Sequence, residues 1–185
     1  MRDSGRSRRT LLMLWQLLTN NLLAIELIAV CQCNAWAGST FHHQGVIAAQ
    51  VTYITDGDTL WVRPLGGGAP FKVRMEGLDA PEICQAWGAQ SREALQVRLN
   101  HQSVMVVIHR YDDYGRAVAR IELRGEDVAA WMVRQGHAWS YRYRRSAGPY
   151  AAEEARARRA RRGLFADTAL EYPRDFRQRH GSCKF

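Results

Sequence analysis

The sequence has few cysteines, and its four do not form the paired spacings of a zinc site. Its six histidines are scattered singly or as one neighbouring pair, so they offer no metal-ligand spacing either. The chain also lacks the ligand pattern of an EF-hand, an internal repeat and a low-complexity tract. These absences exclude a zinc finger, a repeat protein and an EF-hand.

Acidic residues are fewer than basic ones, 18 against 26, which gives a formal net charge of +8. Such a charge favours an anionic partner: nucleic acid, a membrane surface or an acidic polysaccharide. Charge alone leaves open a basic protein with no such partner. At 185 residues and 46% hydrophobic composition, the chain is ordinary globular material with room for one main domain.

The chain lacks a long uninterrupted apolar run. Four arginines precede the apolar segment near the N-terminus, and Asn20, Asn21 and Glu26 interrupt it, which argues against a transmembrane helix. Small residues at Ala35 and Ala37 predict signal-peptide cleavage before Gly38, although an uncleaved membrane anchor is the alternative. We therefore expect a secreted or periplasmic protein. The predicted divisions are a signal peptide or anchor (1–37), a linker (38–45), one domain (46–165) and an irregular C-terminal tail (166–185).

Cleavage at that position would remove two of the four cysteines and leave Cys84 and Cys183. In an oxidising compartment two cysteines are expected to form one disulfide, which would hold the tail beside the loop that carries Cys84. Two free thiols are the alternative.

Alternating and short apolar runs predict five strands, three of them in a meander. The expected strands are residues 46–54, 59–63, 71–77, 103–109 and 116–123. Helical periodicity and end signals predict three helices. These are expected in residues 87–100, 125–136 and 148–163. The fold class is therefore α+β and β-rich, and a barrel of this strand number would be of the oligonucleotide-binding type.

The stretch TDGDTL joins the first two predicted strands. Asp56 and Gly57 form a strong hairpin signal, in which the glycine is expected to supply a positive φ. The turn does not explain Asp58, which begins the next strand.

Acidic side chains recur after the third strand, at Asp79 and Glu82. Together with Asp58 they offer three hard oxygen donors, which suit calcium or magnesium. Arg74 and Arg116 each lie near a turn and could form a phosphate clamp, because guanidinium groups bind phosphate oxygens in pairs. Each residue taken alone also has an ordinary explanation, such as a turn or a cross-strand ion pair.

Four motifs occur in one order: ITDGDTL, VRMEGLDAPE, DDYGR and VRQGHAWSYRY. In this order and at these separations they resemble the staphylococcal nuclease family over Val46 to Phe165. Each motif is weak or moderate alone, but four in register are specific. The resemblance implies an oligonucleotide-binding-type barrel with three helices and a Ca²⁺-dependent phosphodiesterase activity.

The resemblance also implies roles for individual residues. Asp58, Asp79 and the backbone carbonyl of Ala80 would bind calcium, with alanine standing where the family enzyme has threonine. Glu82 would be the general base that orients the attacking water. The scissile phosphate would be bound by Arg74 and Arg116, and nucleotide bases would contact Tyr114, Tyr141 and Tyr143.

We therefore expect an exported, monomeric, calcium-dependent endonuclease without an obligate protein partner. It would hydrolyse DNA and RNA, preferring single strands, to products with 3′-phosphates. The alternative is a catalytically inactive barrel that only binds nucleic acid, but such a module would have little reason to retain three carboxylates and two arginines. A basic envelope protein would explain the charge and none of the motifs.

Overall fold

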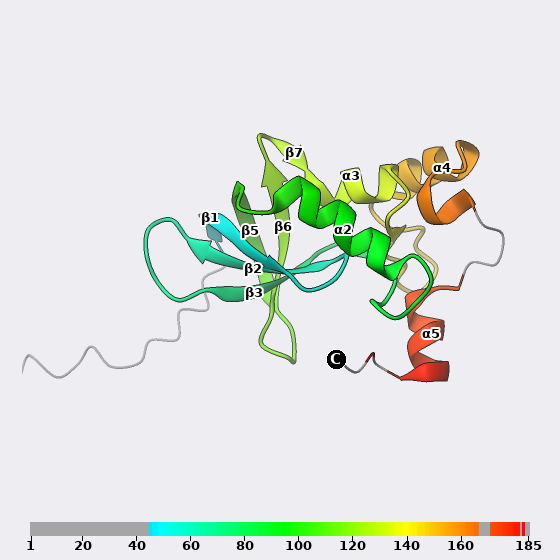
Figure 1. The fold of residues 1–185 in the computed structure, drawn as a ribbon, viewed down its shortest axis with the longest axis horizontal. Coiled ribbons are helices and arrows are strands. Elements are labelled where there is room, and N and C mark those ends of the chain that lie inside the picture. The colour runs from blue at the N-terminus through cyan, green and yellow to red at the C-terminus, as the bar shows by residue number, and fades with distance from the viewer. Residues whose placement is uncertain (1–44, 167–170, 182, 184–185) are drawn as a thin grey trace, which may run out of the picture. The chain divides into compact units, whose positions relative to one another are not determined.

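The computed structural model describes residues 45–166, 171–181 and 183. Five long strands dominate it (Figure 1). They are β1 (Gly45–Ile54), β2 (Thr59–Pro64), β3 (Phe71–Met75), β5 (Ser103–Tyr111) and β6 (Ala117–Leu123). The predicted meander is confirmed, because β1 pairs antiparallel with β2, and β2 pairs antiparallel with β3.

The sheet closes on itself. β5 pairs antiparallel with both β1 and β6, and β6 then pairs in parallel with β3. In this last pairing Arg74 lies opposite Val118, so the start of β6 runs beside the segment that carries Arg74. The predicted five-stranded barrel of the oligonucleotide-binding type is confirmed.

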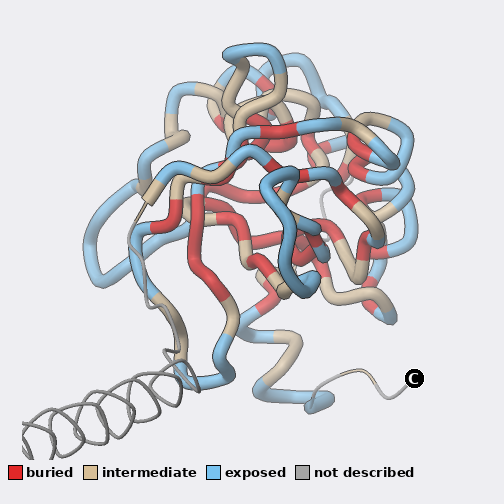
Figure 2. Tube along the Cα trace, turned by 90° about the vertical axis from the view of Figure 1, so that its left-hand side faces the viewer, coloured by how far each residue is buried: buried red, intermediate tan, exposed pale blue. Residues whose placement is uncertain are grey.

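The alternation of apolar and polar residues determines which side chains fill the barrel. Val73 and Met75 of β3 are buried, whereas Arg74 between them is only partly covered. The same alternation buries Leu60 and Val62 of β2, on either side of the exposed Trp61. Figure 2 shows the buried residues concentrated on the inner segments and the exposed ones on the outer loops.

The three predicted helices are present. They are α2 (Gly88–Leu99), α3 (Val128–Arg134) and α4 (Ala151–Arg159). The helix α2 packs on β1, and α3 contacts both β6 and α4. The helix α3 begins later than expected because the side chain of Asp127 caps it, accepting hydrogen bonds from the backbone N–H groups of Ala129 and Ala130. A 3-10 turn, η1 (Gly163–Ala166), follows α4.

Short two-residue strands complete the described elements. They are β4 (Leu78–Asp79), β7 (Glu126–Asp127) and β8 (Trp139–Ser140). β4 pairs with β8, which brings the segment after β3 beside the segment before Tyr141.

The prediction of an irregular C-terminal tail is wrong for α5 (Pro173–His180). Pro173 begins this helix, Asp175 lies in its first turn and basic residues occupy its last turn, an order that suits the helix dipole. The helix escaped prediction because it is short and mostly polar, and Phe176 is its one large apolar side chain.

The predicted signal peptide and most of the predicted linker lie outside the described residues; the first strand begins at Gly45, one residue before the predicted domain start. Within the part of the chain that is described, no helix is both long and apolar enough to cross a membrane.

Candidate active site

The TDGDTL turn places Asp58 inside the protein. Asp56 Oδ1 accepts a hydrogen bond from the Asp58 backbone N–H at 3.0 Å, which holds the turn between β1 and β2. The expectation of a positive φ at Gly57 is wrong. The glycine is needed for space instead, because a Cβ there would lie 2.0 Å from Ser91 Oγ and 2.7 Å from the Ala80 side chain.

The carboxylate of Asp58 accepts hydrogen bonds from Arg74, Thr59 and Ala80, and these contacts explain its position directly before β2. Its Oδ1 accepts hydrogen bonds from Arg74 Nη1 at 2.6 Å and from Thr59 Oγ1 at 2.8 Å. Its Oδ2 accepts one from the Ala80 backbone N–H at 3.3 Å. Only 4% of the residue is exposed, so the turn delivers a buried, fully engaged carboxylate rather than a surface one.

Arg74 bridges two aspartates. Its Nη2 lies 3.2 Å from Asp79 Oδ1, while its Nη1 contacts Asp58. Arg74 extends from β3 and Asp79 belongs to β4, so the short strand after β3 turns its carboxylate back toward the same guanidinium. The predicted association of Arg74, Asp58 and Asp79 is thus present in the fold.

The carboxylates around Arg74 exceed the positive charge available to them. Burial, reinforced by the charge of Asp58, raises the pKa of Asp79 to about 6, although Arg74 and Arg177 oppose the shift. Burial and the same neighbour raise the pKa of Asp56 to about 7. Burial also acts to raise the pKa of Asp58, but Arg74 and the hydrogen bonds from Thr59 and Ala80 hold it below its usual value. A site of this kind attracts a cation.

The donor chemistry fits a hard cation. Asp58 and Asp79 supply two carboxylates, and the Ala80 backbone lies against one of them. Among the described residues, no three His, Cys, Asp or Glu side chains are arranged as a metal-binding group. The expected group of three donors, Asp58, Asp79 and Glu82, is therefore not assembled in the structure, where Glu82 pairs with Arg177. The set implied by the resemblance needs only two carboxylates, with a carbonyl and solvent oxygens completing the coordination, which calcium accepts.

Glu82 lies in the loop between β4 and α2, where its carboxylate meets an arginine that the sequence did not single out. Arg177 of α5 donates from Nη1 to Glu82 Oε1 at 2.5 Å, and the same nitrogen lies 3.8 Å from Asp79 Oδ1. The two residues are 95 positions apart, and the tail was expected to be irregular. In the sequence, only the predicted disulfide between Cys84 and Cys183 indicated that the tail lies beside the loop that carries Glu82.

A disulfide joins Cys84 to Cys183, with Cα atoms 5.8 Å apart. It connects the residue just after the DAPE loop to the chain that follows α5. Gln85 adds two hydrogen bonds at the same place: its Oε1 accepts from the Glu82 backbone N–H, and its Nε2 donates to the Glu171 carbonyl.

Arg116 ends the DDYGR turn just before β6. Its Nε donates to Asp112 Oδ2 at 2.7 Å, and its guanidinium lies 5.4 Å from the centre of the Tyr114 ring. Tyr114 is 85% exposed, so its ring has a face open to solvent. Because β6 runs beside β3, Arg116, directly before β6, lies close along the chain to the strand that pairs with the strand of Arg74.

Tyr141 and Tyr143 follow β8, and both are exposed. The backbone N–H of Tyr141 donates to the Gly77 carbonyl at 2.9 Å, which fixes this segment beside the turn after β3.

One cavity of about 1180 Å³ is lined by most of the predicted site residues. Its lining includes Asp58, Arg74, Ala80, Glu82, Arg116, Arg177 and the three tyrosines. Asp79 is not part of the lining, but it contacts Arg74, which is.

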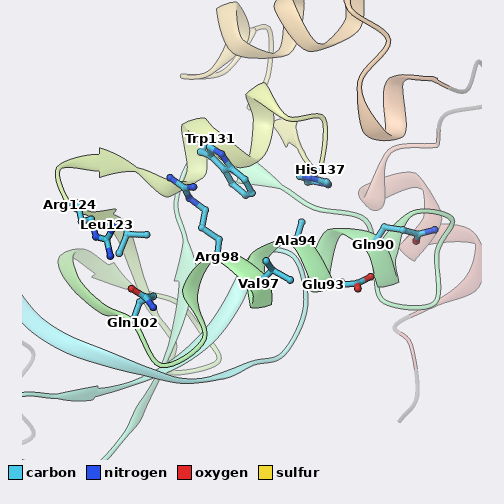
Figure 3. A pocket seen from close by; sticks show the side chains of 10 residues that line it. All are labelled: Gln90, Glu93, Ala94, Val97, Arg98, Gln102, Leu123, Arg124, Trp131 and His137. Atoms are coloured by element: carbon cyan, nitrogen blue, oxygen red, sulfur yellow. The ribbon is translucent and has the colours of Figure 1, made fainter.

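A second cavity, of about 740 Å³, lies between α2 and α3 (Figure 3). Arg98 points toward Trp131 there, with the guanidinium 4.3 Å from the ring centre, and His137 lies nearby. None of the predicted site residues lines this cavity.

An oligonucleotide-binding-type barrel whose cavity carries buried carboxylates, arginines and exposed aromatic rings indicates a nucleic-acid-binding class of protein. Residues 72–167 match the family described as staphylococcal nuclease homologue. The chain belongs to this family.

Individual relatives agree with the family match. The chain is similar to the micrococcal nuclease of Shigella flexneri, 31% identical over 169 residues, which cover 84% of this chain and 90% of that protein. It is 35% identical to protein ParB of Escherichia coli over 143 residues, 71% of this chain and 80% of that one. It is also 34% identical to the probable staphylococcal-like nuclease CAN2 of Oryza sativa subsp. japonica over 108 residues. That match covers 58% of this chain and only 29% of the plant protein.

Proposed function

We propose that the protein is a nuclease that hydrolyses phosphodiester bonds in DNA and RNA. The observation that carries the proposal is that Arg74, in the cavity that Asp58, Glu82 and Arg116 also line, contacts both Asp58 and Asp79. Similarity to the micrococcal nuclease of Shigella flexneri over most of both chains supports it.

We propose that calcium is the cofactor, bound by Asp58, Asp79 and the Ala80 carbonyl. The raised pKa of Asp79, caused by burial and by the charge of Asp58, supports a site that gains stability when a cation arrives. When bound, the ion would neutralise negative charge on the phosphate oxygens.

The arginines would stabilise the charge that builds on the equatorial phosphate oxygens during in-line attack by water. Among the described residues, Arg116 forms an ion pair with Asp112 alone, and its side chain lines the cavity. Arg74 carries two donors toward carboxylates in the structure, and a guanidinium offers further donors for a phosphate. Preorganised donors of this kind contribute about 3 kcal/mol each to transition-state stabilisation.

Glu82 would orient the attacking water and accept its proton. The new bond forms between this water oxygen and phosphorus. The P–O5′ bond would break and the leaving O5′ would take a proton from solvent, so the products would carry a 3′-phosphate and a 5′-hydroxyl. The carboxylate of Glu82 is partly exposed in the same cavity, which supports access by water.

Tyr114, Tyr141 and Tyr143 would stack on unpaired bases. All three are exposed and line the cavity, which supports a preference for single strands, because stacking needs bases that are not enclosed in a duplex.

We further propose that the protein acts as an exported monomer. The disulfide between Cys84 and Cys183 supports an oxidising compartment.

The test is cleavage of a labelled single-stranded DNA, a matched duplex and a matched RNA by the full chain, with Ca²⁺, with Mg²⁺ and with a chelator. We expect cleavage with Ca²⁺ only, fastest on the single strand, and 3′-phosphate product ends. Binding without cleavage under every condition would instead favour the inactive nucleic-acid-binding barrel.

A further inference from the structure

Resting on the proposed function, we propose that Arg177 is a positioning residue for Glu82, and that the Cys84–Cys183 disulfide keeps it in place. The C-terminal segment would then be part of the active site rather than an appendage. The contact between Arg177 Nη1 and Glu82 Oε1 at 2.5 Å is the observation that leads to this inference.

The surroundings of Glu82 explain why it needs such a partner. It belongs to a loop rather than to a helix or strand, and about a quarter of its side chain, 24%, is exposed. In the described part of the chain, Arg177 is the group found against its carboxylate. A glutamate on a loop has several rotatable bonds, so an arginine that grips one carboxylate oxygen narrows the orientations it can adopt.

The helix α5 is held to the barrel on both sides of Arg177. Before the helix, Tyr172 packs against Trp139, with ring centres 5.3 Å apart, and the Glu171 carbonyl accepts the hydrogen bond from Gln85. After the helix, Cys183 is bonded to Cys84, two residues beyond Glu82. The loop and the helix are therefore fastened to each other at two points, and the Arg177–Glu82 contact lies between them.

The charge around Arg177 also fits this role. Its guanidinium lies between Glu82 and Asp79, so it adds a second cation beside Asp79, which Arg74 also contacts. Its shorter contact is with Glu82, at 2.5 Å, against 3.8 Å for Asp79. We therefore expect it to act on Glu82 and through it on the water.

The central experiment measures kcat and KM of the full chain on single-stranded DNA with saturating Ca²⁺ for Arg177→Ala, Arg177→Lys and Arg179→Ala. Arg179 is the matched control, because it lies on the same helix but pairs with Glu171. We expect Arg177→Ala to lower kcat about 30-fold with KM changed less than about threefold, since a misplaced catalytic group costs up to about 100-fold. Arg177→Lys should recover most of the loss, and Arg179→Ala should behave as wild type.

The disulfide adds a second arm. Cys183→Ser should lower kcat as Arg177→Ala does. The variant that carries both substitutions should be no slower than Arg177→Ala alone, because both substitutions remove the contact between Arg177 and Glu82. A double variant whose losses multiply would show that the disulfide does not act through Arg177. A rise in kcat for Arg177→Ala would identify an inhibitory contact, and a rise in KM alone would identify a phosphate ligand; each result would overturn the proposal.

A readout without catalysis separates this inference from the proposed function. The melting temperatures of Arg177→Ala, Glu82→Gln and the double variant are measured without Ca²⁺ or substrate. If Arg177 and Glu82 interact, the melting temperature of the double variant shifts by less than the sum of the two single shifts. This holds whether or not the wild type cleaves DNA. Additive shifts would overturn the contact itself. If the wild type does not cleave, the proposed function fails, and additive or non-additive shifts still decide the inference.

Discussion

Among the described residues, two networks that join arginines to buried carboxylates have opposite charge ratios. Around Arg74, Asp56, Asp58 and Asp79 all contribute to raising the pKa of the guanidinium, with Asp58 contributing most. Around Glu154, which is 2% exposed, the ratio is reversed, because Arg142 and Arg158 both pair with its carboxylate. The backbone N–H of Ser140 donates a further hydrogen bond to Glu154.

The way in which the excess charge is balanced distinguishes a structural network from a functional one. In the Glu154 network the one buried carboxylate meets two arginines, which are about half exposed, so water can balance the excess positive charge. The network ties α4 to the segment around β8 and needs no ligand. The Arg74 network has more carboxylates than cations, and it opens on the larger cavity. Natural proteins tolerate such an imbalance chiefly at functional sites.

The largest expected effect is on catalysis at the Arg74 network. Arg74→Lys should lower kcat by about 100-fold or more, because an ammonium group cannot contact Asp58, Asp79 and a phosphate with the paired geometry of a guanidinium. The free energy of unfolding should change by less than about 1 kcal/mol. Cleavage rates and urea unfolding curves measure the two effects, and equal losses of activity and stability would argue against a catalytic role.

The next effect is on stability at the other network. Glu154→Ala should lower the free energy of unfolding by about 2 kcal/mol, since it removes charged hydrogen bonds and leaves the Ser140 N–H without its acceptor. The arginines are about half exposed and can turn toward water, which limits the cost. Urea unfolding checks the value; a change below about 0.5 kcal/mol would contradict a structural role.

Tyr114→Ala should raise KM for single-stranded DNA about tenfold while leaving kcat within about twofold, because a stacked base contributes about 1–3 kcal/mol of binding. Stability should not change, since the ring is 85% exposed. A matched measurement on Tyr53→Ala, whose exposed ring lies under Arg92 away from the site cavity, provides the control. Equal effects of both substitutions would contradict the stacking role.

The smallest expected effect depends on pH. Burial and the charge of Asp58 raise the pKa of Asp56 to about 7 in the folded protein, against 3.8 in the unfolded chain. Above pH 3.8 the carboxyl therefore ionises more readily in the unfolded chain, which lowers the free energy of unfolding. This penalty grows as pH rises toward about 7 and is then constant. In the absence of metal, Asp56→Asn should therefore be about 1 kcal/mol more stable than wild type at pH 8 and nearly equal to it near pH 4. Unfolding at both pH values measures this, and a difference that shrinks with rising pH would contradict the sign.

Local patterns in the sequence predicted much of this structure. The strands follow from alternation, and the helices follow from periodicity and end signals. Asp58 lies directly before β2, Arg74 in β3 and Asp79 in β4, so the pairing of the strands brings the three residues together. Long-range contacts could not be predicted in the same way. Gly57 is required by Ser91 of α2, and Glu82 meets Arg177 of a polar helix that has no apolar signature.

The most direct test of the account compares two neutralised carboxylates, one from each network. Single-stranded DNA cleavage by the full chain is measured with Ca²⁺ for wild type, Asp58→Asn and Glu154→Gln, with each rate corrected for the folded fraction. We expect Asp58→Asn to lose at least about 100-fold in rate and Glu154→Gln to keep its rate within about threefold. A similar rate for Asp58→Asn and wild type, or a loss confined to Glu154→Gln, would contradict the placement of the active site around Arg74.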